Sequence, residues 1–224
     1  MGRDDEVRRL HGLLPDGLVL AAVDPAEVDT ARLHPVERTL GDGALPTRRQ
    51  DLLGGRVAAR ACLDELGVES RPLRMRDDGA PAWPDSVRGT IAHTTGICLA
   101  VVGRSATVSG VGVDVEPARP TPGVVRSLVL TDRESAHAGH DALDPDIGPL
   151  AFCAKEAYYK WCRSAGHTGP LDFQDVEVEL RDNRLRFVPG DAVTGGLSTT
   201  VPGPMGAFVA GPAWVVALVW SDVS

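Results

Sequence analysis

Cysteine is scarce in this 224-residue chain, and its few cysteines resemble neither a metal site nor a disulfide framework. Cys62, Cys98, Cys153 and Cys162 form no CxxC pair, and each lies within an apolar stretch. Buried free thiols in a reducing compartment are the usual state of such cysteines. The sequence therefore disfavours a zinc site and predicts a fold that needs no disulfides.

Long hydrophobic runs and an excess of positive charge are missing as well. The longest apolar run, residues 213–220, is far too short to cross a bilayer, and residues 1–6 are too polar for a signal peptide. The formal net charge of −8 argues against a nucleic-acid partner, because binding a polyphosphate backbone depends on cationic neutralisation. We therefore expect a soluble, cytoplasmic protein with no nucleic-acid and no membrane partner.

The apolar content of 43% is enough for a packed core, and its spacing changes along the chain. After a short polar segment, alternating or continuous apolar runs predict strands, and helical spacing predicts three helices. The expected strands cover residues 18–23, 89–93, 97–103, 108–116, 173–180, 185–188, 206–210 and 214–220, and the expected helices cover 47–66, a segment beginning at 131, and 150–164. Helices and hairpins are segregated without a βαβ rhythm, which predicts an α+β fold with mostly antiparallel sheets. A division into halves near residue 105 is expected, although no linker composition marks it.

Two carboxylates occupy alternate positions of the strand at 108–116. Asp114 and Glu116 share one face, about 7 Å apart at their backbones, while the intervening valines take the opposite face toward a core. Two ionised carboxylates repel each other, and a hard divalent cation such as magnesium relieves that repulsion. The alternative is a strand that ends in solvent with two exposed acids.

A second pair of charged residues lies on the helix at 150–164. Glu156 and Lys160 are one turn apart, which by itself is typical of an exposed ion pair on a helix surface. The helix at 47–66 carries a basic cluster that could hold an anionic substrate or could simply be solvated. The members of this cluster are Arg48, Arg49, Arg56 and Arg60.

The order of these motifs resembles a known family. Gly-Val-Asp-Val-Glu at 112–116, followed by Phe-Cys-Ala-Lys-Glu-Ala-Tyr-Tyr-Lys at 152–160, is similar to the two signature motifs of the 4'-phosphopantetheinyl transferases. Upstream, residues 33–38, the helix at 48–66 and the stretch from 79 to 94 resemble the subclass that activates nonribosomal peptide, polyketide and siderophore synthases. The resemblance covers about residues 30 to 180. It implies two similar-sized α/β halves related by pseudo-twofold symmetry: 1–105 would grip the coenzyme A nucleotide and 106–224 would carry magnesium and the catalytic residues.

The resemblance also implies an activity, that of a holo-[acyl-carrier-protein] synthase type enzyme. It would transfer the 4'-phosphopantetheine group of coenzyme A to a serine hydroxyl of an apo acyl or peptidyl carrier protein. Mg²⁺, with Mn²⁺ as an alternative, would be held by Asp114, Glu116 and Glu156. Glu156 would also act as general base, directly or through a metal-bound water. Lys160 and Lys155 would offset charge on the transferring phosphoryl and on the leaving 3',5'-adenosine bisphosphate.

Carried over by position, other residues would bind coenzyme A. Arg48 and Arg56 match positions that grip the 3'-phosphate, and the remaining matches are Gly79, Pro81, His93 and Thr94. Relatives often carry a lysine before the Gly-x-Pro stretch, so the cation there is Arg76 or Arg74, or is missing. Thr90 stands where a serine is common and keeps the hydroxyl.

Two rival functions remain open at this point: a magnesium-dependent hydrolase of a nucleotide diphosphate, and a non-catalytic carrier-binding or nucleotide-binding module. A binding-only protein has no physical need for Asp114, Glu116, Glu156 and Lys160 together. We expect a monomer whose two halves share the active site. Apolar Val124, Val125 and Leu128 form either a surface that docks the carrier protein or part of the core.

Overall fold

The computed structural model describes residues 3–69, 71–77, 79–137, 147–167, 169–190 and 203–223. Its α-helices are α1 (Arg3–His11), α2 (Pro46–Glu65), α3 (Gly123–Val129), α4 (Asp132–His137) and α5 (Gly148–Ser164). Its strands are β1 (Leu18–Val23), β2 (Val87–Thr94), β3 (Ile97–Arg104), β4 (Val108–Pro117), β5 (Val176–Arg181), β6 (Arg184–Pro189), β7 (Met205–Ala210) and β8 (Trp214–Asp222). Short 3-10 helices are η1 (Pro25–Glu27), η2 (Thr30–Arg32) and η3 (Phe173–Asp175).

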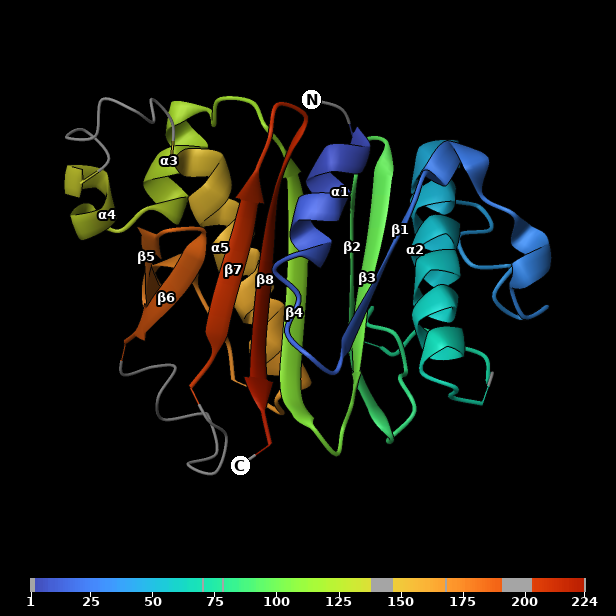
Figure 1. Cartoon of the computed structure of the whole chain (residues 1–224). Helices are drawn as coiled ribbons and strands as arrows, with labels where there is room; N and C mark the ends of the chain where they lie inside the picture. Colours follow the sequence, from blue (N-terminus) through green and yellow to red (C-terminus); the bar gives the residue numbers. More distant parts are fainter. Residues whose placement is uncertain are drawn as a thin grey trace.

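The strands form two antiparallel sheets, which confirms the predicted α+β class. One sheet has the order β1-β3-β2, and the other has the order β4-β8-β7-β6-β5. Helix α2 packs on the first sheet, and α5 lies behind the second (Figure 1). Each half thus places one long helix on an antiparallel sheet, although the two sheets differ in their number of strands.

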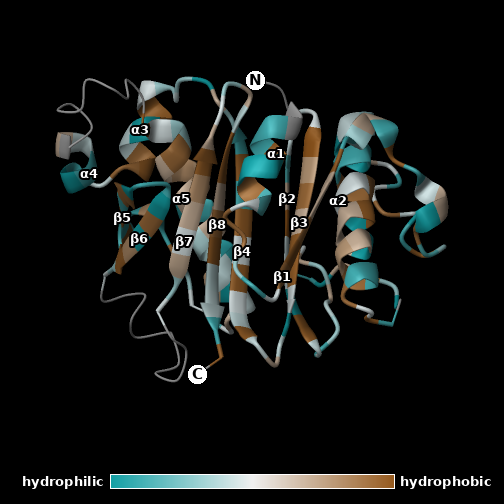
Figure 2. Cartoon of the chain, in the orientation of Figure 1, coloured by the Kyte–Doolittle hydropathy of each residue, from teal (hydrophilic) through white to brown (hydrophobic). Residues whose placement is uncertain are grey.

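The two sheets meet where β2 packs beside β4. The Val113 amide of β4 donates to Thr90 Oγ1 of β2 at 3.3 Å, and the Trp214 indole N–H donates to the carbonyl of Thr95 at 3.3 Å. One hydrophobic cluster includes side chains of β1, β2, β3, β4, β7 and β8. Figure 2 shows this continuous apolar centre along the strands. The halves therefore share a core.

Helix α1 was not expected from the sequence, which suggested only a polar segment. Its Leu10 is fully buried in the shared core. Glu6 is also buried, and its Oε1 accepts the amide hydrogen of Ala213 at 3.0 Å in the β7–β8 connection. Helix α1 crosses the face of the sheets opposite α5 (Figure 1), so strand β4 is covered on both faces.

Strand β4 confirms the predicted alternation of faces. Val111, Val113 and Val115 are fully buried in the core that α1 covers. The other face lies against α5, where a Cβ on Gly112 would clash with the carbonyl of Ala157. The glycine therefore allows the helix backbone to approach the strand closely. This contact brings the carboxylates of β4 and the charged residues of α5 to one place.

The predicted element ends are confirmed where a turn requires special backbone geometry. Helix α2 ends before Gly67, which has a φ of 63°, and the β5–β6 turn places Asp182 and Asn183 at φ 47° and 61°. All four cysteines lie within the described residues, and all are buried without a disulfide, as expected. Within the described ranges, the helices are too short or too polar to span a bilayer.

Candidate active site

Asp114 lies at the centre of the charged cluster between β4 and α5. Its side chain is 9% exposed, and Oδ1 accepts a hydrogen bond from Lys160 Nζ at 2.7 Å. Lys160 also donates to the carbonyl of Val113 at 3.1 Å. Lys160 therefore forms its ion pair with Asp114, so the alternative of a solvent-exposed Glu156–Lys160 pair does not describe this helix. Asp114 Oδ2 is buried and has no hydrogen-bond partner among the described residues.

The neighbouring carboxylates have raised pKa values. The pKa of Glu116 is raised to about 7, first by burial and then by the charges of Asp114 and Glu156, while Lys160 opposes the shift. Burial also raises the pKa of Glu156, with a contribution from Asp114. Asp114, Glu116 and Glu156 therefore affect one another electrostatically, as the two predicted motifs require.

The cluster does not form a ready-made metal cage. Among the described residues, no group of three or more His, Cys, Asp or Glu side chains is arranged to hold an ion. The Lys160 ammonium occupies one oxygen of Asp114, the central carboxylate. An ion at this position would have to share Asp114 with Lys160 or displace it.

A second cluster lies where the N-terminal part of α2 approaches the end of β2. Arg48 Nη1 is 2.8 Å from His93 Nε2, and Asp51 Oδ2 is 3.6 Å from His93 Nδ1. Burial lowers the pKa of His93, and Lys160 and Asp114 both act on this imidazole. The basic cluster on α2 and the acidic cluster on β4 and α5 are therefore neighbours across the junction of the sheets.

The other arginines of α2 differ in environment. Arg56 is 4% exposed, and its Nε donates to the carbonyl of Leu73 at 3.0 Å. Arg60 forms a buried ion pair with Glu37 at 2.7 Å and is a structural residue, in contrast to the solvated basic face considered from the sequence. The buried carboxylate of Glu37 faces the buried guanidinium groups of both Arg56 and Arg60, so this region retains positive charge.

The stretch that follows Leu73 forms a small hairpin. Met75 pairs with Pro81 in an isolated bridge, and the Arg76 amide donates to the carbonyl of Ala80 at 2.8 Å. Gly79 takes a φ of 81° at the turn. Arg74 and Arg76 lie exposed on this hairpin, and Arg56 contacts Leu73 in the segment that leads into it. Thr94, at the end of β2, is half-buried next to His93.

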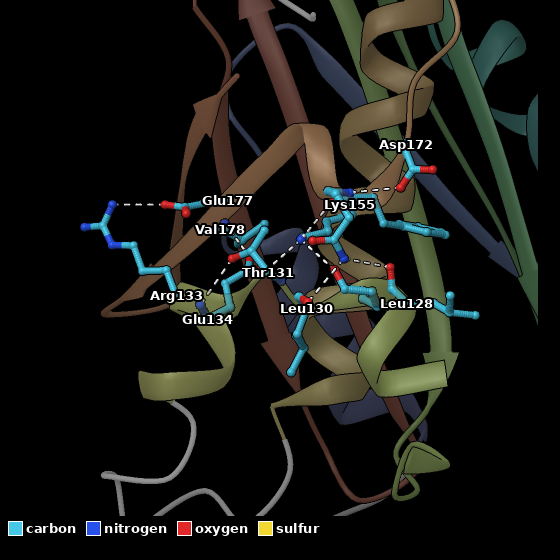
Figure 3. A network of polar contacts seen from close by, with 12 residues as sticks. Leu128, Leu130, Thr131, Arg133, Glu134, Lys155, Asp172, Glu177 and Val178 are labelled. Atoms are coloured by element: carbon cyan, nitrogen blue, oxygen red, sulfur yellow. Dashed lines mark hydrogen bonds and ion pairs between the residues drawn. The ribbon is translucent and has the colours of Figure 1, made fainter. Parts of the chain in front are cut away.

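The structure contradicts the catalytic role predicted for Lys155. Its side chain is 1% exposed, and Nζ donates to Glu134 Oε2 at 2.7 Å and to the carbonyls of Val129 and Phe173 at 2.7 and 2.9 Å. Figure 3 shows this network between α4, α5 and η3. An ammonium group has three protons, and all are used here. Lys155 therefore anchors α5 and has no proton left for a phosphoryl group.

Glu134 connects the start of α4 with α5 and β5 through its carboxylate. The Thr131–Glu134 capping box is present, because Thr131 N donates to Glu134 Oε2 at 2.8 Å and Glu134 N donates to Thr131 Oγ1 at 3.2 Å. Glu134 Oε1 additionally accepts the amide hydrogen of Val178 at 2.7 Å. The cap could be read from spacing, but the partners Lys155 and Val178 could not.

Two cavities lie beside the carboxylates. One of about 320 Å³ extends from Glu156 along Tyr158, Leu171 and Phe173. Another of about 210 Å³ extends from Glu116 toward Val125. Beyond it the side chains predicted as either docking surface or core are exposed: Val124 by 77%, Val125 by 38% and Leu128 by 63%. The exposure excludes the core alternative.

Comparisons with known proteins identify the family of the chain. Residues 36–103 match the 4'-phosphopantetheinyl transferase N-terminal domain, and residues 110–192 match the 4'-phosphopantetheinyl transferase superfamily. The chain is 34% identical to 4'-phosphopantetheinyl transferase Svp of Streptomyces mobaraensis over 94% of its own length and 88% of the relative. It is 35% identical to Npt of Nocardia iowensis, over 80% and 89% of the two chains. It is 38% identical to PptT of Mycobacterium tuberculosis, over 76% and 75%. With two family models matched across both halves and relatives aligned over most of their length, this chain belongs to the 4'-phosphopantetheinyl transferase family.

Proposed function

We propose that the chain transfers the 4'-phosphopantetheine group of coenzyme A to a serine of an apo acyl or peptidyl carrier protein, as a holo-[acyl-carrier-protein] synthase does. The observation that carries the residue assignment is the convergence of two clusters. The acids Asp114, Glu116 and Glu156 with Lys160 lie on one side of the sheet junction, and Arg48 with His93 lies on the other. Coenzyme A carries a diphosphate and a separate nucleotide phosphate. It therefore needs the acidic cluster, which would hold a cation against the diphosphate, and the cationic cluster, which would bind the nucleotide phosphate.

The cationic side of the site suits the nucleotide end of coenzyme A. Arg48 is exposed and offers a planar fork of donors that matches phosphate geometry. His93 adds a ring nitrogen next to it. Arg56 contributes mainly through its buried charge, because its Nε is already bonded to Leu73. Arg56 contacts Leu73, which directly precedes the hairpin. The hairpin residues would therefore also border the nucleotide end of coenzyme A: Arg74, Arg76, Gly79 and Pro81.

The acidic side of the site fits a divalent cation in charge and in donor type. Asp114 Oδ2 is a buried oxygen without a partner among the described residues, and the pKa of Glu116 is raised by its acidic neighbours. Asp114, Glu116 and Glu156 would hold Mg²⁺, or Mn²⁺ in its place, since all three supply hard oxygen ligands. When bound, the ion would neutralise charge on the diphosphate.

Glu156 is the general base of this proposal. The serine oxygen of the carrier forms a bond to the β-phosphorus, and the bond from that phosphorus to the bridging oxygen of 3',5'-adenosine bisphosphate breaks. The serine proton passes to the carboxylate of Glu156, whose raised pKa brings it closer to working pH. Lys160 lies beside Asp114 and would offset charge as the leaving group departs.

The substrate protein would meet the site from the side of α3. The cavity beside Glu116 opens toward the exposed apolar side chains of α3, so this surface is our candidate for carrier docking. We further propose that the enzyme works as a monomer, since the described chain supplies both clusters itself.

The deciding experiment is the intact mass of an apo carrier protein after incubation with the enzyme, coenzyme A and Mg²⁺. We expect a gain of one phosphopantetheine group, abolished by EDTA. Hydrolysis of coenzyme A without a change in carrier mass, over several acyl and peptidyl carriers, would contradict the transfer reaction.

A further inference from the structure

Asp51 is a charged residue beside Arg48 and His93, and the proposed function gives Asp51 no role. It lies on α2 one turn after Arg48, so both side chains project from the same side of the helix. The Asp51 side chain is 25% exposed and the His93 side chain is 32% exposed, with 3.6 Å between Oδ2 and Nδ1. The Asp51 backbone carbonyl, in contrast, accepts from the buried Cys98 thiol.

The contact between Arg48 and His93 determines how the imidazole is protonated. Arg48 Nη1 lies 2.8 Å from His93 Nε2, and a guanidinium group can only donate. Nε2 must therefore carry the lone pair, which leaves the ring proton of neutral His93 on Nδ1. Nδ1 is the nitrogen that faces Asp51. A carboxylate on that side favours this tautomer and fixes the plane of the ring.

Charged groups from three elements surround this imidazole. Asp51 and Arg48 come from α2, Asp114 comes from β4 and Lys160 comes from α5. Burial, Arg48 and Lys160 lower the pKa of His93, while the two acids raise it. Of the two acids, Asp51 has its carboxylate oxygen 3.6 Å from the ring nitrogen Nδ1, and it is separate from the proposed metal ligands.

We propose that Asp51 is a positioning residue for His93, which orients the ring and stabilises its protonated form when a phosphate group of coenzyme A binds. The proposal rests on the function proposed above. When phosphate attracts Arg48, Nε2 loses its hydrogen-bond donor and becomes free to take up a proton, and the resulting N–H donates a hydrogen bond to the phosphate oxygen. The carboxylate of Asp51 then faces an imidazolium group, which strengthens the pair.

The first test observes the histidine directly and needs no activity. Nitrogen-15 NMR of the ring should report His93 as the Nδ1–H tautomer in the free wild-type protein. The Asp51→Ala protein should show a lower pKa of His93, while the neutral ring keeps the Nδ1–H tautomer that Arg48 imposes. An unchanged pKa of His93 would overturn the proposal.

The second test measures coenzyme A affinity by calorimetry in a double-mutant cycle. Asp51→Asn should weaken binding about fivefold, the upper range for a partly exposed ion pair. The same substitution in a His93→Ala background should change the affinity by less than about twofold, because the partner of Asp51 is gone. Asp64→Asn, an exposed charge change on the same helix, serves as the matched control and should bind as the wild type does.

The pH dependence distinguishes positioning from a general effect on folding. If protonated His93 binds phosphate, affinity is highest below its pKa and falls as pH rises through it. Removing Asp51 lowers that pKa, so the fall should begin at lower pH in Asp51→Asn. Equal losses from Asp51→Asn with and without His93 would overturn the proposal. Absence of coenzyme A binding by the wild type would instead contradict the proposed function, and the NMR test would still decide the role of Asp51.

Discussion

Neighbouring residues in the Lys155-Glu156 pair serve different purposes because consecutive positions on a helix point about 100° apart. Glu156 lies toward the acidic cluster with Asp114. Lys155 turns toward Glu134 and two backbone carbonyls, and its side chain is buried. Adjacency in the sequence motif therefore does not imply a shared role at the site.

The general-base assignment predicts a selective defect in Glu156→Gln. Gln keeps the size of the side chain but cannot accept the serine proton, so transfer should fall by about 100-fold or more. Coenzyme A binding should be retained, because the nucleotide grip lies mainly on Arg48 and Arg56. Carrier mass against time measures the first quantity and calorimetry measures the second. Equal losses of binding and turnover would contradict the assignment.

The structural role of Lys155 predicts the opposite pattern for Lys155→Met. The substitution leaves Glu134 buried without its cation, so the free energy of unfolding should fall by about 3–5 kcal/mol. Transfer per folded molecule should largely persist. Lys160→Met is the matched comparison: the Lys160 side chain is 27% exposed, so its replacement should cost less stability and reduce transfer about 100-fold. Urea denaturation measures stability. A Lys155→Met protein of normal stability but without activity would restore the catalytic role rejected above.

At the scale of elements, the contact between β4 and α5 sets the geometry of the site. Gly112→Ala should push the two apart, since its Cβ would meet the backbone of Ala157 and Trp161. We expect a loss of about 1–3 kcal/mol in stability from overpacking, with a larger relative loss of transfer because Asp114 and Glu156 lie on opposite sides of the contact. Thermal melts and initial rates measure the two effects.

Gly203→Ala is the control for that substitution. It lies just before β7 and outside the helices and strands, where a Cβ would meet nothing within 4 Å. Stability and activity should remain close to those of the wild type. If Gly112→Ala behaved like Gly203→Ala, close approach of α5 would not matter for the site.

Elements with strong periodicity could be predicted from the sequence. Helices α2 and α5 were expected within a few residues of their bounds, because each repeats apolar side chains at helical spacing over several turns. Helix α1 was missed because its sequence is mostly polar, and its stability depends on Leu10 and on the buried contact of Glu6 with Ala213. That contact joins residues at opposite ends of the chain, so local sequence patterns could not predict it.

The features of the site also fall into two groups, those that the sequence could predict and those that depend on the assembled fold. The shared face of Asp114 and Glu116 follows from strand alternation, and their use with Glu156 was implied by the family resemblance. The pairing of Lys160 with Asp114, and the position of Asp51 opposite His93, depend on how α5 and α2 pack on different sheets. Such contacts require the assembled fold, so sequence periodicity could not supply them.

At the scale of the whole molecule, the expected division at residue 105 coincides with the turn between β3 and β4, yet it does not separate two cores. Side chains from both sides of it form one hydrophobic cluster, and α1 packs on β7. Since β2 also supplies Thr90 to β4, the site and the core are built across the same junction. Unfolding should therefore be a single cooperative transition, and events at the site should affect the stability of the entire chain.

The acidic cluster links that global stability to pH. The pKa of Glu116 is raised from 4.5 to about 7 by burial and acidic neighbours, so the folded state binds its proton more tightly than the unfolded state does. Its contribution to stability is therefore fully present below about pH 4.5 and is lost as pH rises toward 7. His93 acts in the opposite sense, because burial lowers its pKa. The comparison of wild type with Glu116→Gln removes the contribution of His93 from the difference.

Magnesium should reverse this loss. A cation held by Asp114, Glu116 and Glu156 favours their ionised forms, so its binding competes with protons and stabilises the folded state most where those protons have left. In EDTA, the melting temperature of the wild type relative to Glu116→Gln should fall between about pH 5 and about pH 8. Adding Mg²⁺ should raise the wild-type melting temperature more at the higher pH, and Glu116→Gln should show a smaller rise. An equal rise at both pH values, or an equal rise in the variant, would mean that the ion stabilises the protein elsewhere and that these carboxylates do not hold it.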